Sequence, residues 1–354
     1  MMNILLLSQF GEWHEPSYFR FYQYFTFFNV KKINISYKSL INHPNSDYYV
    51  YDKVKFRNNI FPNFKRILDL EFNSNYDLLW VDSEALPNIP FVLESFFLPL
   101  NKKVILDLGD STHFKYEKSN RKYYKYFMRD KISGLIQRAD GVISRNSTIK
   151  EYVDQFKKDN SYVVHSGIDT KIYQPVSYVQ DYSNTETVIG FIGTFFSSHY
   201  LLKISDVLKE ISRVYPIRLV ILNGNEKLSF PIKFNHIRTT SHEEEINELS
   251  KIDIGVFPTP LSLKETGNSG LGILKCMALA KPVIACDIGS AVDFISHGEN
   301  GYLCRNTDDW YLALRSLLDE KELGLSYGEE SRKKIESEFS IEKTYSDLKK
   351  IFEL

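Results

Sequence analysis

The sequence predicts an α/β protein with two domains, each built on an open parallel sheet. The chain has 354 residues, a length that suits two domains of about 100 to 200 residues each. Short runs of Ile, Leu and Val alternate with longer amphipathic stretches, as in parallel strands joined by helical crossovers. The alternation occurs twice, on either side of a polar stretch at 174–186. We therefore expect two Rossmann-like domains with parallel sheets facing a central cleft, where the carboxyl ends of the strands bind ligands.

The first half of the chain contains six hydrophobic runs of strand length. They predict strands at 3–8, 33–37, 78–81, 104–108, 141–144 and 162–164. Two amphipathic stretches, 17–28 and 121–138, predict helices. In the second stretch, apolar side chains from Tyr124 to Ile136 recur at helical spacing. We expect the first domain to span residues 1–175.

The second half repeats this pattern. Strands are predicted at 187–192, 218–222, 236–239, 254–258, 282–285 and 301–304, and helices at 200–214, 243–249, 270–279 and 308–318. The stretch 174–186 has no periodicity and contains Pro175, so it is the predicted domain boundary. The second domain is expected at 186–335. The last segment, 327–354, is predicted to be helical with an interruption near Phe339 and Ser340.

Charge and cysteine spacing argue against several classes of function. The net charge is −1, from 44 basic and 45 acidic residues, so the whole chain has no electrostatic attraction to nucleic acid or anionic lipid. Cys276, Cys286 and Cys304 lack the paired spacings of a zinc site, and we expect reduced core thiols. The N-terminal apolar run is too short for a signal peptide, and no window approaches the ~18 apolar residues of a membrane span. A cytoplasmic protein is expected, with no nucleic-acid partner.

Two turns between a strand and a helix could bind phosphate. The strand predicted at 187–192 leads into Gly193 and Thr194, and the loop after the strand at 254–258 contains Gly267, Asn268, Ser269 and Gly270. A helix N-terminus supplies free N–H groups, and glycine lets a phosphate approach the backbone. Both turns could equally be tight connections, with Asn268 and Ser269 as simple helix caps. The dinucleotide fingerprint GxGxxG is absent after both first strands, which argues against a nicotinamide enzyme.

Several short motifs follow one another in a recognisable order. In the second half they are Phe257-Pro258, the Gly-containing loop, ILKCMA at 273–278, KPVIA at 281–285, Gly289 and HGENGYL at 297–303. In the first half they are SYFR at 17–20, YDLLWV at 76–81, EALP at 84–87, VILDLGD at 104–110, ADGVIS at 139–144 and VVHSGID at 163–169. Together these motifs resemble retaining GT-B glycosyltransferases of the GT4 type, from residue 3 to about 320.

The sequence departs from that family at a pair of acidic positions. The family usually carries two Glu separated by seven residues, and these positions fall on Gly267 and Lys275. Glu265 is the nearest acid that could replace the first Glu. Lys275 could meet a phosphate or point to solvent.

The resemblance implies transfer of a sugar from a nucleotide sugar with retention, as in hexosyltransferases. It implies no metal and no cofactor, with the nucleotide sugar as substrate and a glycan or lipid-linked acceptor. It also implies that a terminal helix, 336–354, packs back on the first domain. Surface polysaccharide or glycoconjugate assembly is the expected pathway.

Candidate site residues combine the strand-end positions with the resemblance. The expected catalytic residues are Glu265, Asp110 and His113. The expected donor-binding residues are Gly193, Thr194, Asn223, Gly267, Asn268, Ser269, Gly270 and Lys275. The expected acceptor-binding residues are Gly11, Arg20, Glu84 and Asp107. Asp107 and Asp110 follow a buried strand, where a carboxylate can bind a sugar hydroxyl or simply cap a helix. Arg20 and Glu84 could instead form a structural ion pair.

Residues 113–131 interleave basic and aromatic side chains (HFKYEKSNRKYYKYFMRDK). This composition suits peripheral contact with the inner face of a membrane, where a lipid-linked acceptor would lie. A solvated helix face whose aromatic side chains pack on the sheet explains the composition equally well.

Two other functions remain open at the level of sequence. The missing acids favour a catalytically inactive GT-B homologue that binds an active transferase. A sugar-nucleotide epimerase, or another α/β enzyme with a phosphate-bearing ligand, would also use turns of this kind.

Overall fold

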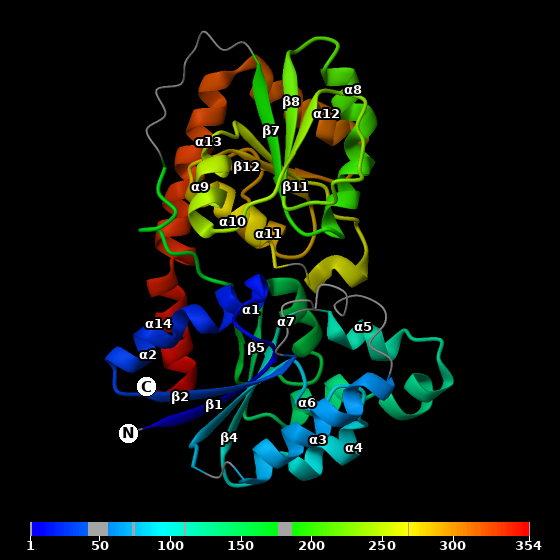
Figure 1. The fold of residues 1–354 in the computed structure, drawn as a ribbon, viewed down its shortest axis with the longest axis vertical. Helices are drawn as coiled ribbons and strands as arrows, with labels where there is room; N and C mark the ends of the chain where they lie inside the picture. Colours follow the sequence, from blue (N-terminus) through cyan, green and yellow to red (C-terminus); the bar gives the residue numbers. More distant parts are fainter. Residues whose placement is uncertain are drawn as a thin grey trace. The chain divides into compact units, whose positions relative to one another are not determined.

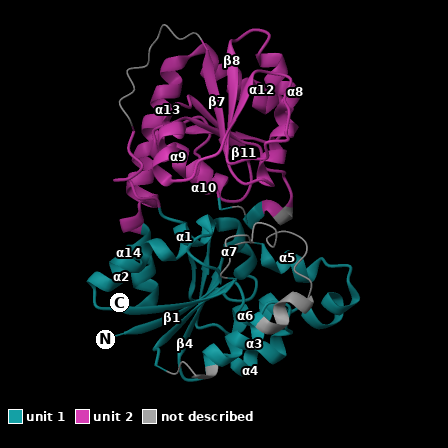
Figure 2. Cartoon of the chain, in the orientation of Figure 1, with its two compact units in different colours: residues 1–167, 266–269, 344–354 teal, residues 168–265, 270–343 magenta. Residues whose placement is uncertain are grey.

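A computed structural model of the chain describes residues 2–41, 56–72, 75–109, 111–175, 186–267 and 269–353. For 56–61, 71, 72, 263 and 264 it describes the backbone alone. The chain forms two compact units, coloured separately in Figure 2. The first contains 1–167, 266–269 and 344–354, and the second contains 168–265 and 270–343. Each unit has one six-stranded sheet in which every paired strand is parallel, as the sequence predicts.

The first unit is a parallel sheet covered by helices on both faces (Figure 1). Its strand order is β2-β1-β3-β4-β5-β6. The strands are β1 (Asn3–Phe10), β2 (Asn34–Ile41), β3 (Leu78–Asp82), β4 (Lys103–Leu108), β5 (Gly141–Ser144) and β6 (Ser161–Val163). The helices are α1 (Glu15–Arg20), η1 (Tyr22–Tyr24), α2 (Phe25–Val30), α3 (Phe56–Phe72), α4 (Phe91–Phe97), α5 (Thr112–Glu117), the π-helical η3 (Tyr124–Met128), α6 (Lys131–Arg138), α7 (Ser147–Val153) and α14 (Ile341–Phe352), whose last residues belong to this unit.

Alternate side chains of the first sheet face two separate helical layers. Leu5, Leu79 and Leu106 belong to a buried cluster that also contains side chains of α3, α5, η3, α6 and α7, and side chains of α4 pack against it. On the other face, the Trp80 ring contacts Phe21 and Phe352, with ring centroids 5.1 and 5.0 Å apart. This two-residue alternation is the one expected of a sheet buried on both sides.

The second unit repeats the architecture with strand order β12-β11-β10-β7-β8-β9. Its strands are β7 (Thr187–Ile192), β8 (Ile217–Leu222), β9 (Phe234–Ile237), β10 (Ile254–Phe257), β11 (Val283–Cys286) and β12 (Gly301–Cys304). Its helices are η4 (Ser197–Ile204), α8 (Ser205–Ile211), α9 (His242–Ser250), η5 (Leu263–Gly267), α10 (Leu271–Ala278), α11 (Ala291–Phe294), α12 (Thr307–Asp319), α13 (Lys321–Lys334) and the π-helical η6 (Ile335–Phe339).

The same aspartate arrangement fixes a strand start in both sheets. Asp77, Asp140 and Asp253 each precede a strand, and their backbone N–H groups donate to Asn3, Val104 and Val188 at 2.8, 2.9 and 2.8 Å. In return, each carboxylate accepts from the backbone N–H of that same residue at 2.8 Å. The side chain thus satisfies a backbone donor at the sheet margin that would otherwise lack a partner.

The predicted boundaries differ from the two units in three places. The change of unit falls between Gly167 and Ile168, eight residues before the predicted end of the first domain at 175, because Ile168 pairs with the segment around Ser340. Its N–H donates to Phe339 O, and its carbonyl accepts from Ile341 N, both at 2.9 Å. The segment that returns to the first unit begins at 344, not 336, and 266–269 also belong to the first unit.

Several predicted helices are interrupted. The stretch 17–28 is divided among α1, η1 and α2. The stretch 121–138 breaks at Arg129 and Asp130, between η3 and α6, and 200–214 consists of η4 followed by α8. The interruption predicted near Phe339 and Ser340 is confirmed, since Ser340 has an extended backbone (φ −64°, ψ 152°) between η6 and α14.

Candidate functional site

The topology of the second unit marks where a ligand is expected. In its strand order the chain runs in opposite directions on either side of the β7–β10 pair. Ligands of open parallel sheets bind at such a switch point, beyond the carboxyl ends of the strands. Gly193 and Thr194 follow β7, and the loop that leads to α10 follows β10. The predicted donor-binding turns therefore flank the switch point.

The turn after β7 is closed by reciprocal hydrogen bonds. Thr194 N donates to Ser197 Oγ at 2.8 Å, and Ser197 N donates to Thr194 Oγ1 at 3.2 Å. A Cβ atom on Gly193 would lie 2.5 Å from Ser197 Oγ and 2.6 Å from the Phe191 ring. Packing within the turn therefore explains why residue 193 is glycine. Thr194 is exposed beside it.

The start of α10 lies close against the end of β7. A Cβ on Gly272, in the first turn of α10, would lie 2.9 Å from Ile192 O and 2.6 Å from the Phe257 ring. Ile192 and Phe257 are the last residues of β7 and β10. Gly270 caps the helix with a φ of +62°, which glycine adopts readily. Glycine at both positions thus brings the N-terminus of α10, the positive end of its helix dipole, to the switch point.

The loop before α10 is shared between the two units. Glu265 is half-buried in η5, and its N–H donates to Ser262 O at 2.9 Å. Gly267 and Ser269 are counted with the first unit, together with Thr266. Thr266 Oγ1 lies 2.8 Å from Ser111 Oγ, and Thr266 O accepts from Asn146 Nδ2 at 2.7 Å. Asn268 lies outside the described residues.

Two residues predicted to bind the donor have structural partners inside the second unit. Asn223 follows β8 with a φ of +58°. Its Nδ2 donates to Thr239 Oγ1 and its Oδ1 accepts from Thr239 N, both at 2.9 Å, so this side chain joins the ends of β8 and β9. Lys275 is buried, and its Nζ lies 2.6 Å from Glu245 Oε1 on α9. The structure thus places Lys275 in a buried ion pair, and not in either of the two roles considered from the sequence, phosphate contact and solvent exposure.

The Lys275–Glu245 pair is part of a larger network. Tyr173 Oη donates to the same carboxylate at 3.0 Å. Arg332 on α13 donates to Tyr173 O at 2.5 Å, to Ala278 O at 2.6 Å and to Thr170 O at 2.9 Å. The network joins segment 168–175 to α9, α10 and α13, so it fixes the orientation of the helix that begins at the switch point.

In the first unit, Arg20 and Asp107 are partners. Arg20 Nη2 and Nε donate to Asp107 Oδ1 at 2.7 and 2.9 Å, and Trp80 Nε1 donates to Asp107 Oδ2 at 3.1 Å. Arg20 also donates to Val164 O, and all of these side chains are buried. The alternative that Arg20 pairs with Glu84 is therefore wrong. Both Asp107 oxygens are occupied below the surface, which opposes the predicted contact of Arg20 and Asp107 with an acceptor.

Glu84 belongs to a second buried cluster. Lys131 Nζ lies 2.7 Å from Glu84 Oε2 and 2.8 Å from Glu94 Oε2, and Tyr116 Oη donates to Glu84 at 2.7 Å. Burial raises the pKa of Glu84, but the charges of Lys131 and Lys115 outweigh it and lower the pKa to about 2. Burial raises the pKa of Glu94 above its ordinary value. The predicted acceptor contact by Glu84 is thus replaced by a structural role.

Two other predicted residues lie at the carboxyl edge of the first sheet. Gly11 follows β1; its N–H donates to Ile41 O at 3.3 Å and its carbonyl accepts from His14 N at 3.1 Å. His113 is buried in the first turn of α5, where its ring stacks on Tyr152 with centroids 3.8 Å apart. Asp110 lies outside the described residues.

Part of the second unit matches a known protein family. Residues 186–320 match the family described as glycosyl transferases group 1. The matched segment contains the β7 turn, α10 and the switch point between them.

Relatives with assigned names extend the likeness beyond this domain. An N-acetyl-alpha-D-glucosaminyl L-malate synthase of Bacillus anthracis is 24% identical over 232 residues, covering 61% of this chain and 60% of the relative. A capsular polysaccharide biosynthesis glycosyltransferase of Staphylococcus aureus is 22% identical over 183 residues, covering 48% of this chain and 46% of the relative. The matched region thus spans at most about 60% of the length of these relatives.

Solved structures agree on the fold. The Anabaena protein HepE, solved in complex with UDP-glucose, is similar to this chain with a TM-score of 0.69 over 100% of both chains at 14% identity. Likeness at this identity concerns the fold, and it establishes the GT-B architecture predicted from the sequence. None of the helices in the described part of the chain is long and apolar enough to cross a membrane.

The structure adds a cation that sequence reasoning missed. Arg145 follows β5 directly, and its Nη2 would lie 2.5 Å from a Cβ on Gly109, the residue after β4. The charge of Arg145 also acts on His14. Burial, and then this charge, lower the pKa of His14 to about 4. The signal was present in the sequence, since Arg145 stands at a predicted strand end, where a guanidinium can bind an anionic group.

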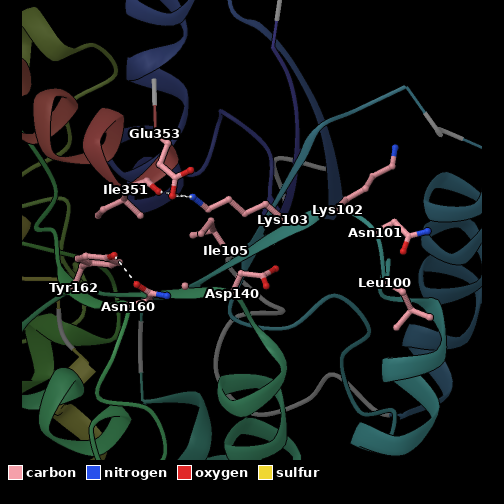
Figure 3. Close-up of a pocket in the computed structure, with 11 residues that line it drawn as sticks. Leu100, Asn101, Lys102, Lys103, Ile105, Asp140, Asn160, Tyr162, Ile351 and Glu353 are labelled. Carbon is pink, nitrogen blue, oxygen red and sulfur yellow. Dashed lines mark hydrogen bonds and ion pairs between the residues drawn. The ribbon is translucent and has the colours of Figure 1, made fainter.

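The two pockets described in the structure lie at the opposite edge of the first sheet. One has a volume of about 440 Å³ and is lined by Lys103, Asp140, Asn160, Tyr162 and residues near the end of α14. Figure 3 shows Lys103 reaching toward Ile351 and Glu353. The other has a volume of about 660 Å³ and is lined by residues such as Asn3, Asn34 and Asp77. Both adjoin strand starts, so neither coincides with the carboxyl-edge positions described above.

Proposed function

We propose that the protein transfers a sugar from a nucleotide sugar to a glycan or lipid-linked acceptor. The observation that carries the proposal is the close approach of α10 to the end of β7, which Gly272 permits. It brings a helix N-terminus beside the turn of Gly193 and Thr194, and this arrangement suits a diphosphate. The match of residues 186–320 to the group 1 glycosyltransferases supports the proposal.

The proposed reaction retains the configuration at the anomeric carbon and needs no metal. Backbone N–H groups at the start of α10 would stabilise the departing diphosphate. Glu265, half-buried in the loop before α10, is the proposed catalytic carboxylate. Asp110 and His113 remain proposed catalytic residues. Arg145 and His14 are added as candidates for binding the acceptor.

The proposed setting is assembly of surface polysaccharide or glycoconjugate at the cytoplasmic face of a membrane. The name of the Staphylococcus aureus relative, a capsular polysaccharide biosynthesis glycosyltransferase, supports this pathway. The exposed basic and aromatic side chains within 113–131 support a peripheral membrane contact.

Calorimetric titration tests donor binding. UDP, GDP, ADP and their common hexose derivatives are titrated into the full chain. We expect one of them to bind, and Gly272→Val to abolish binding, because its side chain would displace α10. If none of these ligands binds the wild-type chain, the transferase proposal fails.

Kinetic assays test the proposed mechanism. With the ligand that binds, Glu265→Ala should lower turnover at least about tenfold, which corresponds to about 1.4 kcal/mol. Glu299→Ala, at an exposed position of the same unit, is the matched control and should leave turnover unchanged. Proton NMR of the product formed in EDTA should show the anomeric configuration of the donor; inversion, or complete inhibition by EDTA, would contradict the mechanism.

One observation favours a second function, that of an inactive binding homologue. Lys275 occupies a position at which the resemblance leads us to expect an acid, and it is consumed by a buried ion pair with Glu245. An inactive homologue would bind a nucleotide sugar without hydrolysing or transferring it, or would bind none. The same titration and turnover assays therefore separate the two functions.

A further inference from the structure

The outward face of α4 is unusually apolar. Its exposed side chains include Val92, Leu93 and Phe96, which are 63%, 52% and 77% exposed, and Leu100 just beyond the helix is 86% exposed. The sequence of α4, FVLESFF, contains a single charged residue, Glu94. That residue is buried against Lys131, with Nζ and Oε2 2.8 Å apart. The helix therefore exposes hydrocarbon and no charge.

Internal contacts hold α4 in this orientation. Glu94 Oε1 accepts from Ala85 N at 2.8 Å. On the same helix, the Phe91 ring packs against α6 so closely that a Cβ on Gly134 would lie 2.6 Å from it. Leu98, just after the helix, belongs to the buried core of the unit. Val92, Leu93 and Phe96 cannot turn inward unless these contacts break.

Elements that lie next to α4 also expose apolar side chains. In α3, which contacts α4, Phe64 and Leu68 are exposed. In η3, Tyr126 and Phe127 are 71% and 65% exposed. Tyr123, at the start of η3, donates to Asn88 O at 3.3 Å, two residues before the N-cap of α4 at Pro90. We call the exposed side chains of α3, α4 and η3 together with Leu100 the apolar face.

Basic side chains border the apolar face on the η3 side. Those exposed around η3 are Lys115, Lys118, Arg121, Lys122, Lys125 and Arg129. In the same stretch Asp130 is exposed, while Glu117 is half-buried and accepts from Tyr152 Oη. The border is therefore strongly positive, although the net charge of the whole chain is −1.

We propose that the apolar face inserts side chains of α4 into the headgroup region of an anionic lipid bilayer, while the basic residues around η3 contact lipid phosphates. A second copy of the chain fits less well, because it would bring two positive borders together. Large exposed apolar side chains beside cations and Tyr are the chemistry of interfacial membrane binding. The inference gives a new element, α4, to the membrane contact proposed above, and it requires neither a donor nor a reaction.

Vesicle sedimentation tests the inference with the full chain. The protein should bind vesicles of equal parts phosphatidylglycerol and phosphatidylcholine at least about tenfold more tightly than vesicles of phosphatidylcholine alone, and salt should weaken the binding. The double variant L93S/F96S and the double variant K122E/K125E should each lower the affinity at least about tenfold. Circular dichroism confirms that each variant is folded.

Matched variants in the second unit control for general changes in hydrophobicity and charge. Leu312→Ser, at an exposed position of α12, and Lys209→Glu, at an exposed position of α8, should leave vesicle binding unchanged. The inference fails if the wild-type chain does not bind anionic vesicles, or if L93S/F96S binds like wild type. Light scattering would also overturn it, in favour of a second copy, if it showed that the wild-type chain is a dimer and that L93S/F96S is a monomer. Calorimetric titration with nucleotides on the same samples separates this failure from failure of the proposed transferase function.

Discussion

At the scale of single residues, buried charge pairs explain several positions that the sequence presents as ligand contacts. Arg20, Asp107, Glu84 and Lys275 are charged residues in or near predicted strand ends and helix starts, yet each is buried with an oppositely charged partner. Removing one member leaves the other charge buried and unpaired, which costs about 3–5 kcal/mol. Substitution of such a residue is therefore as restricted as substitution of a residue that contacts a ligand.

The Lys275–Glu245 pair gives a prediction of this kind. Lys275→Met should lower the free energy of unfolding by about 3–5 kcal/mol, because the Glu245 carboxylate stays buried without its ion-pair partner. The double variant K275M/E245L should recover most of this loss. Urea unfolding provides the measurement. Lys251→Met, which breaks the exposed Lys251–Glu248 pair at the end of α9, is the control and should cost less than about 1 kcal/mol. A loss no larger than the control's would contradict the buried-pair account.

Glu84 predicts a dependence of stability on pH. Its pKa is lowered from 4.5 to about 2 in the folded chain. The stabilisation is therefore present above pH 4.5 and is lost as the pH falls toward 2; it amounts to about 3 kcal/mol. Urea unfolding should show wild type more stable than Glu84→Gln at pH 7, with the difference shrinking below pH 4.5. Glu353→Gln, which removes an exposed pair with Lys103, should show little difference at any pH. A wild-type advantage that stays constant down to pH 3 would rule out this assignment.

At the scale of elements, the hydrophobic period and the length of a segment decide whether its helix or strand can be predicted from the sequence. The strand runs appear in place because buried parallel strands read as continuous apolar stretches. Strand β9, which pairs with β8, is observed at Phe234–Ile237. It begins two residues before the start predicted at 236, because Ile237 pairs with Leu222 in the observed register. Helix α4 was missed because FVLESFF is apolar on nearly all sides and shows no helical period.

The start of α10 yields the prediction that belongs to this scale. Gly272→Ala should weaken nucleotide binding at least about tenfold, since its Cβ would lie 2.9 Å from Ile192 O and force α10 away from β7. Calorimetric titration with the nucleotide found to bind provides the measurement. The control is Gly324→Ala in α13, whose Cβ would meet no described atom closer than 3.7 Å. That change should leave affinity unaltered and raise helix stability by about 0.5–1 kcal/mol. Equal affinities for the two variants would show that close packing of α10 does not matter.

At the scale of the whole molecule, distant parts of the chain complete the first unit. Residues 344–354 belong to it, although the second unit lies between them and the first sheet in the sequence. The Phe352 ring contacts Trp80, and Tyr24 Oη lies 2.8 Å from Thr344 Oγ1. One face of the first sheet is therefore covered by residues that lie far from it in the sequence.

Phe352 offers a test at this scale. Phe352→Ala should destabilise the first unit by about 3–5 kcal/mol, because the ring is fully buried against Trp80 and Phe28. Denaturant unfolding followed by near-ultraviolet circular dichroism reports the loss. Leu325→Ala, on an exposed face of α13, should change stability by no more than about 0.5 kcal/mol. Equal stability of the two variants would mean that α14 does not stabilise the first sheet.

The sequence by itself determined the two parallel sheets, the places where glycine turns follow β7 and β10, and the resemblance to a glycosyltransferase family. These features depend on local signals, namely apolar period, turn residues and motif order. Only the tertiary structure decided which charges meet. Arg20 finds Asp107, Glu84 finds Lys131, and Lys275 finds Glu245, each from a different element. A single sequence shows that a charge stands at a strand end or in a helix, but burial with a partner far along the chain is decided by how the elements pack. The apolar face around α4 is likewise visible only once the buried side of that helix is known.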